Sequence, residues 1–114
     1  MNAETWIAVV DVYDHARSYL QMVYEGAEFA QWLHRTIPVN FVDGVFIIEV
    51  PSEKVYSLFT RRSEHLSILQ ALQAATPREW GVTVGVDFTI GQDVDVGQGR
   101  QVTAEPDYLE MEAV

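Results

Sequence analysis

The hydrophobic residues of this chain follow a helical repeat first, then a strand repeat, and these changes predict its elements. Within residues 4–24 apolar side chains recur every three or four positions, which indicates an amphipathic helix of about five turns. These side chains are Trp6, Val9, Val10, Tyr13, Ala16, Tyr19, Leu20 and Val23. Gly26 is the first local breaker, and a second helix is expected over residues 27–35, where Phe29 and Trp32 share a face.

The dipeptide Asp43-Gly44 stands between two runs of β-branched and aromatic residues. A type I′ turn needs two residues that tolerate positive φ, so this dipeptide predicts an antiparallel hairpin. Pro51 ends the second strand, and Ser52 offers a side-chain oxygen as the N-cap of a new helix. Residues 45–48 are apolar without alternation, which is typical of a strand covered on both faces, or on one face plus a partner.

A third helical repeat follows Ser52 and ends at Thr76, because Pro77 pushes the residue before it out of the α region. Its length and the polar run at residues 61–64 predict a bend or a break. Over residues 82–90 apolar side chains alternate strictly with polar or small ones, which predicts a strand with one buried face.

The predicted element order is therefore α-α-β-β-α-β, within residues 1–92. Three strands with helices on one face give an α+β fold, a two-layer sandwich. Residues 93–114 lack sustained periodicity and are predicted to be a mobile acidic tail. An alternative interpretation of that tail is a short amphipathic docking motif around Tyr108, Leu109 and Met111.

Composition narrows the class of protein. With 114 residues, 48% of them hydrophobic, the chain is expected to form one domain with a true core. It has no cysteine, which excludes disulfides and thiolate zinc sites. No apolar run approaches the roughly 20 residues of a membrane span, and the first residues lack the basic region of a signal peptide, so a cytoplasmic protein is expected. The net charge of −10 argues against nonspecific nucleic-acid binding.

Candidate chemistry is sparse. Asp11 and His15 have the i, i+4 spacing of two metal ligands or an acid–base pair, but a third ligand is not apparent, and a solvated helix face explains them better. Lys54, Arg61 and Arg62 form the one basic cluster, suited to weak contact with single-stranded DNA or with an acidic partner, although a solvated helix face is the simpler interpretation. The sequence contains no hydrolase, zincin or dinucleotide motif, so we expect no catalytic residue, no metal and no cofactor.

The element order and several short motifs resemble the N-terminal domain of the bacterial replication initiator DnaA. In that family the first helix carries a Trp, as Trp6 does here, and the second carries a Phe-x-x-Trp pair, matched by Phe29 and Trp32. The second strand ends in an apolar residue and Pro, matched at positions 50–51. The resemblance covers about residues 4–90 and implies a KH-like fold without the Gly-x-x-Gly loop that clamps nucleic acid.

The resemblance also implies which residues bind partners. In that family the domain self-associates, contacts the replicative helicase and binds regulators of initiation. The self-association surface involves the helix-one Trp, which corresponds to Trp6, and the helicase contact involves the acid before the helix-two Phe, which corresponds to Glu28. A second contact position falls near Lys54, where the residue type differs. Without the resemblance, Trp6 is explained as a core residue and Glu28 as an acid in the first turn of a helix.

Three functions follow as hypotheses. The first is a non-catalytic protein-interaction module that binds replication-initiation or helicase-loading proteins, or a like domain. Full-length DnaA also has an ATPase domain and a DNA-binding helix-turn-helix, and this sequence contains neither, so neither activity is expected. The second is an acidic regulator of phage or plasmid type, acting as a DNA mimic or as an inhibitor of a nucleic-acid enzyme. The third is a small enzyme whose site the sequence does not reveal.

Overall fold

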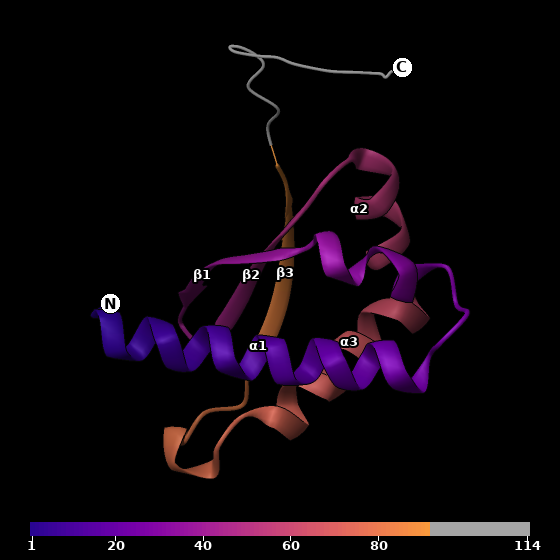
Figure 1. The fold of residues 1–114 in the computed structure, drawn as a ribbon. Helices are drawn as coiled ribbons and strands as arrows, with labels where there is room; N and C mark the ends of the chain where they lie inside the picture. The colour runs from indigo at the N-terminus through magenta and orange to yellow at the C-terminus, as the bar shows by residue number, and fades with distance from the viewer. Residues whose placement is uncertain (92–114) are drawn as a thin grey trace.

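The computed structural model describes residues 1–91, which form an α+β fold (Figure 1). The predicted acidic tail at residues 93–114 lies outside the described residues. The elements in chain order are α1 (Ala3–Val23), the 3₁₀ helix η1 (Phe29–Arg35), β1 (Ile37–Val42), β2 (Val45–Val50), α2 (Glu53–Phe59), α3 (Arg62–Ala75), the 3₁₀ helix η2 (Arg78–Trp80) and β3 (Gly85–Ile90). The predicted α+β class is confirmed, and the predicted order roughly matches, with two α-helices and a 3₁₀ helix between β2 and β3 in place of one helix.

The three strands form one mixed sheet in the order β1-β2-β3. β1 and β2 pair antiparallel through the Asp-Gly turn, and β3 adds parallel to β2 after the crossover through α2 and α3. Phe46, Ile48 and Val50 of β2 are buried, whereas the side chains between them are partly exposed, so the helices cover one face of the sheet. The register of β1 shifts between Pro38 and Asn40, where the strand carries an irregularity.

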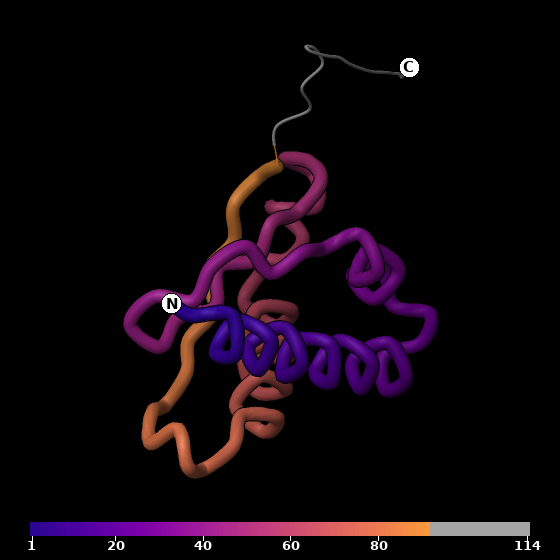
Figure 2. The backbone as a smooth tube through the Cα atoms, turned by 60° about the vertical axis from the view of Figure 1, so that its left-hand side comes forward, coloured from indigo at the N-terminus to yellow at the C-terminus, as the bar shows by residue number. Residues whose placement is uncertain are grey.

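Helix α1 supplies the largest helical share of the core. Asn2 caps it, because its side chain accepts a hydrogen bond from the Thr5 backbone N–H at 2.8 Å. α1 packs against α3, which it crosses (Figure 2). Its buried positions are Val9, Val12, Tyr13, Ala16 and Leu20. The expectation that Tyr19 and Val23 belong to this face was wrong: they are 50% and 48% exposed, because the buried stripe runs through Val12, Ala16 and Leu20 instead.

The predicted break in the third helix is confirmed and lies at residues 60–61, where the polar run begins. Thr60 ends α2, and its hydroxyl donates to the Tyr56 carbonyl at 2.8 Å. Arg61 then has an extended backbone (ψ 146°) before α3 begins. Ser52 caps α2 as expected, accepting from the Val55 N–H at 3.3 Å. Because of this break, α2 and α3 each pack an apolar face against the sheet.

Two element boundaries differ from the sequence prediction. The second helix is a 3₁₀ helix that begins at Phe29, after Gly26 has turned the chain with φ at 92°. The third strand begins at Gly85, since its partner β2 begins at Val45 opposite it, and residues 82–84 therefore have no strand to pair with. Within the predicted buried face Val84, Val86 and Phe88 are buried, but Val82 and Ile90, at the two ends, are exposed.

The hairpin turn gives a direct test of the fold. Asp43 and Gly44 have φ values of 52° and 79°, as a type I′ turn requires. Gly44→Ala places a Cβ in the left-handed region and is expected to lower the free energy of unfolding by about 1–2 kcal/mol. Gly85→Ala is the matched control, because its new Cβ meets Val45 only at an ordinary 3.6 Å. Urea denaturation measures both, and equal losses would contradict the turn assignment.

Candidate functional site

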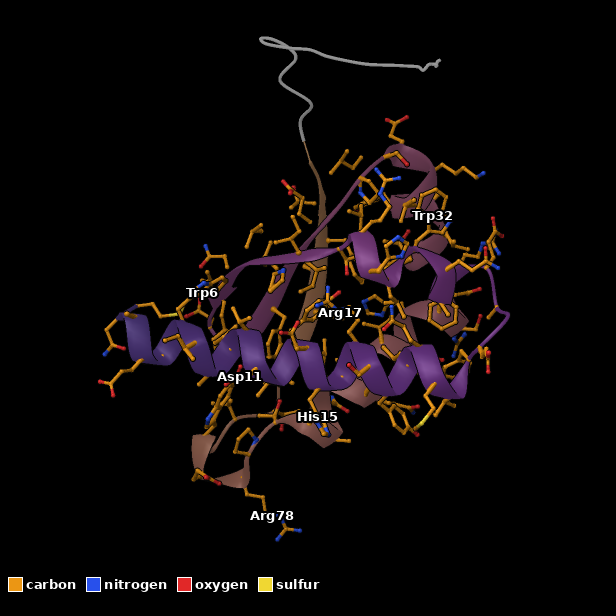
Figure 3. All side chains as sticks on the ribbon, in the orientation of Figure 1. Trp6, Asp11, His15, Arg17, Trp32 and Arg78 are labelled. Atoms are coloured by element: carbon orange, nitrogen blue, oxygen red, sulfur yellow. The ribbon has the colours of Figure 1, made fainter. Side chains whose placement is uncertain are left out.

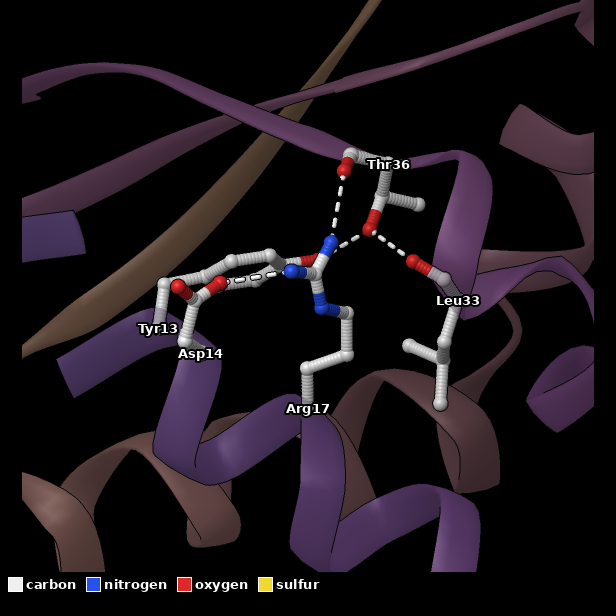
Figure 4. A network of polar contacts seen from close by, with 5 residues as sticks. All are labelled: Tyr13, Asp14, Arg17, Leu33 and Thr36. Carbon is white, nitrogen blue, oxygen red and sulfur yellow. Dashed lines mark hydrogen bonds and ion pairs between the residues drawn. The ribbon is translucent and has the colours of Figure 1, made fainter. Parts of the chain in front are cut away.

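A buried polar network ties α1 to the start of β1 (Figure 4). Thr36 is 2% exposed, and its hydroxyl donates to the Leu33 carbonyl at 2.6 Å. Because that hydrogen is used, the Tyr13 hydroxyl is the donor in its hydrogen bond to the Thr36 side-chain oxygen. Arg17 donates to the Thr36 carbonyl at 3.1 Å and pairs with Asp14 at 2.6 Å. The network fixes how far α1 can rotate against β1.

The chemistry of this network is structural. Burial raises the pKa of Tyr13 to about 12, so its hydroxyl stays protonated at neutral pH. The Arg17 guanidinium also lies over the Tyr13 ring, 5.4 Å from its centroid. Each polar group in the network has a partner, and no residue of the network lines either of the two grooves of residues 1–91 described below.

Trp6 lies on the side of α1 that faces β1 (Figure 3). It precedes Tyr13 by two helical turns, and Tyr13 bonds the residue before β1, so the helical repeat places both on one side. Its side chain is partly buried and packs against the core. Beside it Ile7 is 60% exposed and Met1 is 64% exposed. Trp6 therefore packs against the core at the end of α1 where two large apolar side chains are exposed.

Glu28 lies beyond the opposite end of α1, immediately before η1. It is exposed, and its side chain makes no capping hydrogen bond to η1, so capping does not explain it. Exposed apolar residues surround this end as well, with Met22 70% and Val23 48% exposed. α1 has 21 residues, which at the usual rise is roughly 30 Å, so the structure does not bring Trp6 and Glu28 together.

The predicted basic cluster is spread over α2. Lys54 lies in the first turn of α2, and Arg61 and Arg62 lie just beyond its last residue, about 10 Å along the helix. All three are exposed, and Arg61 pairs with Glu64 at 3.8 Å. Since α2 packs against η1, Lys54 lies on an element adjacent to that of Glu28.

Asp11 and His15 are both exposed on α1. His15 lines a small groove of about 190 Å³ between α1 and α3, together with Tyr19, Gln70 and Ala74. Asp11 is not among the residues that line it. Among residues 1–91 there is no group of three or more His, Cys, Asp or Glu side chains that could hold a metal ion.

Sequence reasoning missed the larger apolar groove, which we call the Trp80 groove. It has a volume of about 480 Å³ and lies between the first turns of α1, the hairpin turn and the segment after η2. Its lining residues are Glu4, Thr5, Ala8, Val9, Phe41, Gly44, Trp80 and Val82. The Phe41 and Trp80 rings meet edge-to-face with centroids 5.7 Å apart. The signal in the sequence was Trp80-Gly81, a large aromatic residue beside a turn residue.

Comparisons with known proteins leave the family open. No protein-family model matches this chain, and no curated protein matches it. The resemblance to the DnaA N-terminal domain therefore rests on the motifs and on the order of the elements. Over residues 1–91, none of the helices combines the length and the apolar character that crossing a membrane requires.

Proposed function

We propose that this protein is a non-catalytic interaction module that acts like the DnaA N-terminal domain. It would bind replication-initiation or helicase-loading proteins, self-associate, or both. The observation that carries the proposal is the pair of surfaces at the two ends of α1. Each combines a residue to which the resemblance assigns a contact, Trp6 or Glu28, with large apolar side chains that are about half exposed or more.

The separation of the two surfaces adds to the proposal. Along α1 the stretch from Trp6 to Val23 spans about 25 Å at the usual helical rise, which leaves room for two partners at once. Apolar side chains that gather on the surface of a small protein often mark sites of association. A module of this kind could hold a like domain at the Trp6 end while the Glu28 end contacts a second protein.

The Trp6 surface is tested by sedimentation of the purified chain. We expect a concentration-dependent dimer, and Trp6→Ala is expected to raise its dissociation constant at least about tenfold, as for an interface hot spot. Because Trp6 also packs against the core, Ile7→Asp is a second variant that alters only an exposed side chain. Trp32→Ala is the matched control, since Trp32 is also partly buried but lies on η1. A monomer at millimolar concentration would rule out self-association.

The Glu28 surface is tested with the replicative helicase of the host, purified and immobilised. We expect retention of the chain, with Glu28→Ala weakening it about tenfold or more. Glu25→Ala removes a nearby exposed acid and serves as the matched control. Equal retention of the two variants, or none of the unmodified chain, would contradict the helicase contact.

No specific observation favours the DNA-mimic alternative. A mimic needs rows of unpaired acids on its folded surface. Residues 1–91 carry eleven acidic and six basic side chains, and two of these acids are paired, Asp14 with Arg17 and Glu64 with Arg61. The acidic excess of the described part is therefore moderate and partly compensated.

A further inference from the structure

The Trp80 groove is the apolar recess that neither the proposed function nor the polar network uses. Its floor is made by Val9, which is fully buried, and by the Phe41–Trp80 ring pair. Its wall on the far side is Val82, which is 50% exposed. With about 480 Å³ it has room for a large side chain, and it lacks the several convergent polar groups that orient a small-molecule ligand. Its form suits the anchor residue of a protein partner.

Acidic residues line the groove or precede a lining residue in the chain, and we call these acids the rim of the groove. Glu4 lines it from the first turn of α1. Asp43 precedes the lining residue Gly44, and Glu79 precedes the lining residue Trp80. The one base of this part of the chain, Arg78, points away from the body of the protein (Figure 3). Glu4, Asp43 and Glu79 are all exposed, and none of them is in an ion pair within residues 1–91.

From this arrangement we propose that the Trp80 groove binds a basic segment of a partner protein, in which one bulky apolar side chain is flanked by Lys or Arg. The apolar side chain would fill the space over Trp80 and Phe41, and the flanking cations would pair with the acids of the rim. This inference rests on the proposed function, because it names the chemistry of one partner of the interaction module. It adds a third surface to those around Trp6 and Glu28.

Two occupants of the groove can be compared by their charge: a basic partner segment and the C-terminal residues of this chain. The segment around Tyr108, Leu109 and Met111 is apolar enough to fill a groove, but residues 105–112 also carry four acids and no base. Those acids would face Glu4, Asp43 and Glu79, and like charges brought together at an interface oppose binding. A basic segment has the opposite balance.

The experiment is a peptide titration of the ¹⁵N-labelled 114-residue chain, followed by NMR. The probe is the peptide Gly-Lys-Lys-Phe-Lys-Lys-Gly, which contains no Trp, so the indole N–H signals report on the protein alone. We expect saturable shifts of the Trp80 indole signal and of the backbone signals of Ala8 and Val82. The peptide with Glu at every Lys position is expected to bind at least about tenfold more weakly.

Variants test the two parts of the proposal separately. Val82→Asp is expected to weaken binding about tenfold, whereas Leu66→Asp, which alters an equally exposed side chain on α3, should leave it unchanged. Glu4→Lys should weaken binding of the basic peptide about threefold and strengthen binding of the acidic peptide. Unchanged Trp6 and Trp32 signals in each variant show that it is folded.

Four results would overturn the proposal. They are no shift of the Trp80 signal, equal binding of the basic and acidic peptides, tighter binding of a peptide of residues 101–114, and a Trp80 shift that follows protein concentration without peptide. The last two would assign the groove to the C-terminal residues or to a second copy of the chain. Failure here leaves the Trp6 and Glu28 experiments unaffected, because neither uses a residue of the groove.

Discussion

Replacing Phe59 by Ala is expected to lower the free energy of unfolding by about 3–5 kcal/mol. Phe59 is fully buried at the end of α2. Its ring meets two others edge-to-face, with centroids 6.3 Å from that of Phe29 in η1 and 5.6 Å from that of Phe88 in β3. The substitution thus opens a cavity where three elements meet. The total free energy of unfolding of a domain of this size is about 5–15 kcal/mol, so this substitution would remove much of the stability.

Urea denaturation of the two proteins side by side measures this loss, and the thermal midpoint should fall by more than about 10 °C. Leu66→Ala is the control, because Leu66 is 47% exposed and its truncation should cost no more than about 0.5 kcal/mol. If both substitutions cost the same, Phe59 is not at the centre of the core.

The second expected result is a loss of stability in alkali that depends on Tyr13. Burial raises the pKa of Tyr13 from 10.0 to about 12 in the folded protein. Between those two pH values the folded chain keeps this proton while the unfolded chain releases it. The free energy of unfolding therefore falls as pH rises above 10, by up to about 1.4 kcal/mol per pH unit and about 2–3 kcal/mol in all.

Denaturation midpoints measured from pH 8 to pH 12 show this slope. Tyr13→Phe should be less stable at pH 8, because Thr36 loses the hydrogen bond donated by Tyr13, but it should lack the added alkaline slope. Tyr24→Phe should retain the slope, since Tyr24 is 36% exposed. An identical pH dependence in Tyr13→Phe and the unmodified chain would show that Tyr13 titrates normally.

Local signals predicted most of the fold. The Asp43-Gly44 turn, the Ser52 cap and the stop at Pro77 act within a few residues, so the sequence alone located them. The placement of β3 beside β2 was harder, because that pairing joins residues about 40 apart in the chain and depends on how α2 and α3 pack. The exposure of Tyr19 and Val23 was missed for a similar reason. The helical repeat predicts that α1 has an apolar face, but the packing of α3 determines which residues of that face are buried.

The candidate surfaces were less predictable than the fold. Trp6 and Glu28 were chosen from a resemblance, and only the structure shows that α1 holds them at its opposite ends. The Trp80 groove combines residues from α1, β1, the hairpin turn, η2 and the segment after η2, and these parts of the chain share no motif. Such a recess exists only after folding, so no local sequence pattern predicts it.

The irregularity in β1 has a consequence for the behaviour of the protein at high concentration. A sheet with two free edges can recruit strands from other molecules, and this leads to aggregation. At the β1 edge Pro38 lacks a backbone N–H, and the register shift before Asn40 interrupts the row of backbone groups, so this edge is a poor template. β3 pairs regularly with β2 from Gly85 to Ile90. Side chains engage two of its remaining backbone groups: Asp87 accepts from the Phe88 N–H at 3.1 Å, and His65 Nε2 lies 3.4 Å from the Val86 carbonyl oxygen, which leaves fewer groups for an incoming strand.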